Sequence, residues 1–115
     1  MSYTPTPEEV QAVADNIVTR KSAKTLADDC LTAYTSADGT MNAAQTMVTS
    51  LINSGETDPT ILAPKIQQLI DATAVRIAAV SAYQAAEAAR SVAQAAVDDS
   101  IGALVTAGLP RPPGP

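Results

Sequence analysis

The stretch SAYQAAEAARSVAQAAV, residues 81–97, decides the fold class, because eight of its seventeen residues are alanine and none is glycine or proline. Alanine is the best helix former, although its side chain buries little apolar surface. The helical pattern extends beyond this stretch, from Lys65 to about Ala107, and only Gly102 interrupts it. Helical patterns of this length are typical of coiled coils, bundles and repeats. The sequence therefore predicts one long Ala-rich helix near the C-terminus.

The small residues of this helix fall into two adjacent rows that repeat every three or four positions. Such rows let a second helix approach closely, so that contact comes from shape and dispersion rather than from bulky side chains. The partner helix could belong to the same chain or to another subunit, and simple helix propensity would also explain the alanines. We predict a helix-packing interface, here called the Ala row, made of Val75, Ala78, Ala79, Ala82, Ala85, Ala86, Ala89, Val92, Ala93 and Ala96.

The first helix has a clear start signal. Thr6 is a favourable N-cap, Pro7 suits the first helical position, and Glu9 completes a capping box with Thr6. Apolar residues then recur at helical spacing as far as Tyr34. Gly39 is the expected stop, because glycine readily adopts the left-handed conformation that follows many helices.

A second helix is expected after Gly39, with Gly55 as its stop. Asp58 and Pro59 together look like another helix start, but Pro64 would then lie inside the helix without an N–H to donate. We therefore expect the third helix to restart at Pro64. The predicted helices span residues 7–37, 41–53 and 64–107.

These elements predict an all-α fold, an elongated helical hairpin or bundle with coiled-coil-like packing. We expect an extended N-terminal arm over residues 1–6 and a single helical domain over 7–108. The Pro-rich end, residues 109–115, cannot be helical and is expected to form a tail. Its Pro110 and Pro113 have the spacing of a P-x-x-P ligand, although a plain terminal tail is the alternative.

Composition argues against several classes of function. The 115-residue chain has no His and one Cys, so transition-metal sites lack their usual ligands. We expect no cofactor, no metal and no catalytic residue, because no nucleophile stands beside a base and no nucleotide-binding glycine pattern occurs. The acidic pairs Asp28–Asp29 and Asp98–Asp99 point about 100° apart on a helix and favour solubility rather than acid–base chemistry.

Charge and hydropathy constrain the partners. The net charge of −5 argues against nucleic acid, which requires a basic face. The one basic cluster, Arg20, Lys21 and Lys24, is either a solvated helix face or a contact for a small anion or acidic partner. No apolar run is long enough to cross a membrane, and the N-terminus MSYTPTPEEV does not resemble a signal peptide. Other protein chains are the expected partners, through homo-oligomerisation or a larger assembly.

Cys30 excludes an intrachain disulfide, since it is the only cysteine. It shares a predicted apolar helix face with Leu26, Ala27, Leu31 and Tyr34. We expect it to be a small buried apolar residue, with an interchain disulfide or a reactive thiol as the alternative.

Two short segments, YQAAE (Tyr83 and Glu87) and YTSAD (Tyr34 and Asp38), resemble the Y-x-x-x-D/E signal of small secreted proteins of the WXG100 class. This resemblance would imply a helical hairpin that acts by pairing its helices with a partner. The W-x-G turn that defines the class is absent, because the chain has no Trp.

The sequence thus predicts a non-enzymatic structural protein, a helical subunit of a larger symmetric assembly. A virion or phage particle fits the small size, the thin core and the missing chemistry. The alternative is a small soluble helical adaptor or WXG100-like secreted protein that acts by helix pairing. Without Phe or Trp, an isolated monomer would be marginally stable, which favours burial against other chains.

Overall fold

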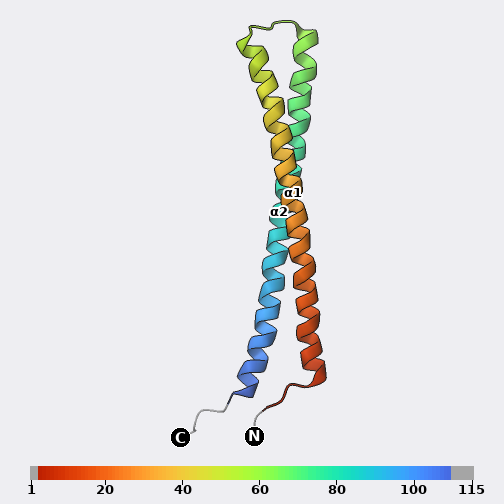
Figure 1. Ribbon diagram of the computed structural model, residues 1–115, viewed down its shortest axis with the longest axis vertical. Helices are drawn as coiled ribbons and strands as arrows, with labels where there is room; N and C mark the ends of the chain where they lie inside the picture. The colour runs from red at the N-terminus through yellow and green to blue at the C-terminus, as the bar shows by residue number, and fades with distance from the viewer. Residues whose placement is uncertain (1–2, 110–115) are drawn as a thin grey trace. The chain divides into compact units, whose positions relative to one another are not determined.

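A computed structural model describes residues 3–109 and contains two α-helices, α1 (Pro7–Asn53) and α2 (Pro59–Gly108) (Figure 1). No strand occurs in this described range, so the predicted all-α fold class is confirmed. Residues 3–6 precede α1 without regular structure. The predictions for residues 1–2 and for the Pro-rich segment 110–115 lie outside the described residues.

The described chain groups into two compact units, each made of one part of α1 and one part of α2. Unit 1 contains the N-terminal part of α1, up to Leu26, and the C-terminal part of α2, from Ala86. Unit 2 contains residues 27–85, which form a helical hairpin closed by the turn between α1 and α2 (Figure 1). Within each unit the two helical segments are antiparallel. The prediction of a single helical domain remains a prediction.

The start of α1 matches the predicted capping box. The backbone N–H of Glu9 donates to Oγ1 of Thr6 at 3.2 Å, and the N–H of Thr6 donates to Oε1 of Glu9 at 2.9 Å. The hydroxyl of Tyr3 also donates to Oε1 of Glu9. The hydrogen bonds from Thr6 and Tyr3 lower the pKa of Glu9 below its ordinary value of 4.5, because they stabilise its ionised form.

Because its pKa is lower in the folded state, ionised Glu9 contributes stability above pH 4.5, and this contribution is lost as pH falls through the folded pKa. We predict that Glu9→Gln, which keeps an acceptor but cannot ionise, loses less stability than the wild type between neutral pH and about pH 3. Urea unfolding midpoints at several pH values measure this difference. Glu8→Gln is the control, because it removes an equal charge from the same helical turn without removing a hydrogen bond to Thr6 or Tyr3. Equal pH dependence of all three proteins would contradict the capping role of Glu9.

The turn between the helices combines the predicted stop and the predicted start. Gly55 adopts a φ of 76°. Its N–H donates to the carbonyl of Ile52 at 3.1 Å, while the N–H of Glu56 donates to the carbonyl of Leu51 at 3.0 Å. These two bonds form a Schellman motif, which satisfies carbonyls at the end of α1. Asp58 then caps α2, because its Oδ1 accepts the N–H of Thr60 at 2.9 Å.

Two predicted helix boundaries are wrong. The predicted division into helices 7–37 and 41–53 does not exist, since α1 runs unbroken through Gly39. Residues on either side of Gly39, Ala37 and Ala44 among them, are buried, and this packing outweighs a glycine cost of about 1 kcal/mol. The helix predicted to restart at Pro64 begins at Pro59 instead, with Pro64 inside it. Pro64 lies near the start of α2, where its missing N–H costs a single intrahelical bond.

Candidate functional site

The Ala row lies mostly on the exterior of the chain. Ala86 and Ala93 are buried, and Ala79 is half-buried. Val75 and Val92 are 60% and 71% exposed. The other exposed members are Ala78, Ala82, Ala85, Ala89 and Ala96. Only part of the row is therefore covered within one chain, and contact of its exposed members with another chain remains a prediction.

The helices instead pack along a neighbouring line of positions, here called the buried line. On both helices, buried and half-buried positions together recur mostly every three or four residues, as in a coiled coil. All eight fully buried apolar residues in the described range are alanine or valine: Ala27, Ala37, Ala44, Val48, Ala72, Ala86, Ala93 and Val97. Alanine thus forms much of the helix contact, as expected from the sequence. Most members of the Ala row, however, lie outside this contact. Small side chains along the buried line permit close approach of the two helices.

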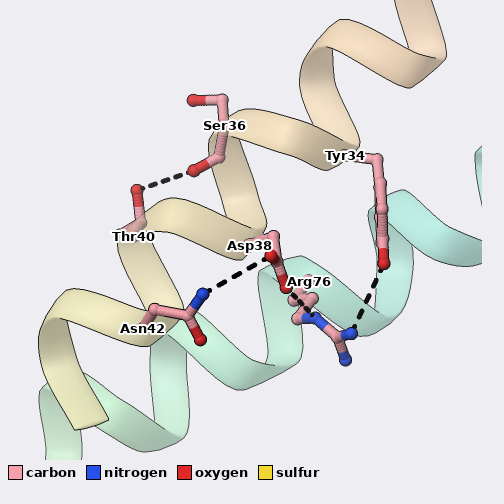
Figure 2. A network of polar contacts seen from close by, with 6 residues as sticks. All are labelled: Tyr34, Ser36, Asp38, Thr40, Asn42 and Arg76. Atoms are coloured by element: carbon pink, nitrogen blue, oxygen red, sulfur yellow. Dashed lines mark hydrogen bonds and ion pairs between the residues drawn. The ribbon is translucent and has the colours of Figure 1, made fainter. Parts of the chain in front are cut away.

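A polar network in unit 2 joins the two helices of the hairpin (Figure 2). Arg76 on α2 donates from Nε to Oδ1 of Asp38 on α1 at 2.7 Å, and from Nη2 to the hydroxyl of Tyr34 at 3.4 Å. Its guanidinium also lies 5.7 Å from the centre of the Tyr34 ring. The Tyr34 ring stacks on Tyr83 with 6.3 Å between ring centres. These contacts fix the relative register of the two helices in unit 2.

The network also changes how the two tyrosine segments are interpreted. Tyr34 and Tyr83 are half-buried and face each other across the hairpin. Asp38 accepts from Arg76, and this bond is the first cause of the raised pKa of Arg76. Glu87 pairs with Arg90 at 3.6 Å, one turn along α2. Three of these four side chains therefore take part in contacts within the hairpin of unit 2.

An apolar groove also lies in unit 2, with a volume of about 480 Å³. Alanine, serine and threonine side chains of α1 form one wall, and residues of α2 form the other. The residues that line it are Ala33, Ser36, Ala37, Thr40, Gln68, Asp71, Ala72 and Val75. Of the Ala row, only Val75 contributes to this groove. Its lining carries a single charged group, Asp71, and offers no constellation of groups for bond-making chemistry.

A second concave surface, here called the basic hollow, lies in unit 1 and has a volume of about 430 Å³. It brings Arg90 of α2 beside the predicted basic cluster of α1, Arg20, Lys21 and Lys24. Four of the seven Lys and Arg residues of the chain therefore gather there. Ile17 and Gln94 complete the lining. Sequence reasoning missed Arg90, because only the antiparallel pairing of the helices brings it to the cluster.

Gln94 connects the basic hollow to a neighbouring carboxylate. Its Oε1 accepts from Nη1 of Arg20 at 3.4 Å, and its Nε2 donates to Oδ1 of Asp98 at 3.0 Å. Within residues 3–109, neither Arg20 nor Lys21 nor Lys24 forms an ion pair. Arg90 pairs with Glu87, so the other three cations of the hollow are the ones left without an ion pair among the described residues.

Cys30 is half-buried on α1, next to the buried line. The apolar face predicted around it is only partly correct. Ala27 is buried and Tyr34 is half-buried, but Leu26 and Leu31 are 53% and 43% exposed. Leu26 lies one position from buried Ala27, and Leu31 lies one position from half-buried Cys30, and the close contact between the helices leaves both leucines uncovered.

Within the described residues, no group of three or more His, Cys, Asp or Glu side chains is placed to hold a metal ion. Neither helix of the described range has the length and apolar character needed to cross a membrane. No protein family, curated protein or solved structure was found to match this chain.

Proposed function

We propose that this chain is a non-enzymatic structural subunit that works by pairing its helices with other chains in a larger symmetric assembly. The observation that carries the proposal is the exposed part of the Ala row. A solvent-facing helix surface is normally covered by charged and polar side chains. Here the exposed members of the row are all alanine or valine, and Val92 is 71% exposed.

Other exposed aliphatic side chains on α2 also support the proposal. Ile70 and Ile77 are exposed, as are Ile66 and Val105. Single exposed aliphatics are ordinary on protein surfaces, but a contiguous row is typical of an interaction surface. The buried line is made of alanine and valine, so it buries little apolar surface within one chain. Helices of other chains would increase the buried apolar surface.

A virion is the setting that we propose for this assembly, since particles are built from many copies of small subunits without chemistry of their own. The alternative is a soluble adaptor or WXG100-like secreted protein, which would pair with one partner instead. The two-helix hairpin of unit 2 is compatible with both. A discrete high-order oligomer favours the structural subunit, and a heterodimer with a single partner favours the adaptor.

The proposal predicts that Val92→Lys weakens self-association without unfolding the helix. A lysine at this position would place an unpaired charge within an apolar contact between chains, which is strongly unfavourable. We expect the association constant to fall by about tenfold or more, and helicity to remain at the wild-type level. Sedimentation velocity over a concentration series and circular dichroism measure the two quantities.

Gln84→Lys is the matched control, because Gln84 is also exposed on α2 but lies outside the Ala row. This variant should associate as the wild type does. If Val92→Lys and Gln84→Lys both leave the oligomer unchanged, the exposed Ala row does not contact another chain, and the proposed function loses the observation that carries it.

A further inference from the structure

One side of the basic hollow of unit 1 is formed by Arg90 of α2, and α2 also carries an acidic residue, Asp98, two turns further along. Arg90, Gln94 and Asp98 are all exposed and follow one another at intervals of four residues on α2. Residues four apart on a helix lie on the same face, about 6 Å apart along the axis. This edge of α2 therefore carries a positive, a neutral and a negative group in an evenly spaced line.

Such a line is complementary to itself when a second copy lies antiparallel to it. A two-fold axis passing beside Gln94 places Asp98 of each copy opposite Arg90 of the other, at the rim of the basic hollow. Because the operation is two-fold, the contact forms twice, and the two amide groups of Gln94 meet at the axis. Two-fold interfaces of this kind, in which the same patch serves both partners, are the commonest in soluble oligomers.

We propose that a second copy of this chain docks antiparallel on unit 1 and inserts its Asp98 carboxylate into the basic hollow. This inference rests on the proposed assembly function and names one of its contacts. The carboxylate would then lie among Arg90, Lys21 and Lys24, and two of these cations come from the other helix. The hollow flanks the buried line on a different edge of α2 from Val92, so it is separate from the Ala row.

Charge and shape favour this occupant over a small free anion. The hollow lies along the middle of two helices, where backbone N–H groups are already bonded within the helix. Only side chains therefore remain to bind a ligand in the hollow. Nucleic acid is disfavoured by the net charge of −5, while a carboxylate from an acidic copy of the same chain matches the cations.

The test compares two neighbouring aspartates. Asp98→Asn removes the charge that enters the hollow but keeps an oxygen that can accept the hydrogen bond from Gln94. Asp99→Asn removes an equal charge from an exposed position about 100° around the helix. In sedimentation at low salt we expect Asp98→Asn to lower the association constant about tenfold, because two symmetric contacts are lost. Asp99→Asn should leave the constant unchanged or raise it slightly, since it reduces repulsion between acidic copies.

A double-mutant cycle identifies the partner of Asp98. In a Lys21→Gln, Lys24→Gln background, Asp98→Asn should have a much smaller effect than in the wild type, because its partners are already neutral. Raising the salt concentration should weaken the wild-type oligomer and remove the difference between the Asp98 and Asp99 variants. Circular dichroism of each variant verifies that the helices are intact.

Equal effects of the Asp98 and Asp99 variants, or an unchanged Asp98 effect in the neutralised background, would overturn the inference. Both results leave an oligomer in place and therefore do not affect the proposed function. A chain that stays monomeric at low salt would instead overturn the inference together with the assembly proposal. Weakening of the wild-type oligomer by free phosphate, beyond that caused by chloride at equal ionic strength, would show that the hollow prefers an anion, and would also overturn it.

Discussion

Ala93→Leu should destabilise the chain by about 1–3 kcal/mol, because leucine adds volume where the helices are already in contact. Ala93 belongs to the buried line of unit 1 and is only 5% exposed. Leucine is nearly as good a helix former as alanine, so helix propensity does not account for a loss of this size. Urea or thermal unfolding, with the oligomer mass measured in parallel, gives the change in the free energy of unfolding.

Ala89→Leu is the matched comparison on the same helix. Ala89 belongs to the predicted Ala row but is exposed in the structure. Its substitution should change the stability of a single chain by no more than about 0.5 kcal/mol. If the exposed Ala row contacts another chain, Ala89→Leu changes the oligomer mass instead. Equal destabilisation by the two leucines without a change of mass would contradict the assignment of the buried line.

Gly39→Ala is the second decisive substitution, and the sign of its effect is informative. In the continuous helix α1, an alanine at this position should stabilise the chain by about 0.5–1 kcal/mol, since glycine is unfavourable within helices. An added Cβ would meet no atom within 4 Å. Had Gly39 ended a helix in the left-handed conformation, as its sequence context predicts, alanine would destabilise by about 1–2 kcal/mol. Chemical unfolding distinguishes the two signs.

Gly55→Ala provides the opposite result within the same protein. Gly55 has a φ of 76°, and no atom lies within 4 Å of an added Cβ, so the cost is purely conformational. We expect this variant to be less stable than the wild type by about 1–2 kcal/mol. If Gly39→Ala and Gly55→Ala both destabilise, α1 does not run through Gly39.

Local chemistry made the ends of the helices predictable. The capping box at Thr6, the cap at Asp58 and the stop at Gly55 depend on residues a few positions apart, and all three occur in the structure. Gly39 and Pro64 carry equally strong local signals but lie within helices. At both positions the packing of the paired helices outweighs a local preference of a few kcal/mol or less, and no short segment of sequence reports that packing.

The position of the helix contact was harder to predict for a different reason. Alanine occupies so many positions of α2 that several adjacent faces have the same small-residue spacing. Polar residues on the actual contact side, such as Asn16 and Arg76, further obscure its apolar pattern. The ion pair of Arg76 with Asp38 depends on the register of two antiparallel helices, and so does the position of Arg90 beside the basic cluster. A single sequence does not reveal this register, so neither of these neighbours could be predicted from it.

The central claim is that this chain works by helix pairing with other chains, and the native mass of the wild-type chain tests it most directly. Sedimentation equilibrium from micromolar to millimolar concentration, at low and high salt, should show a discrete oligomer that dissociates on dilution. Its melting temperature should rise with protein concentration, because association stabilises the folded state. A monomer at every concentration, with a high and concentration-independent melting temperature, would contradict the account.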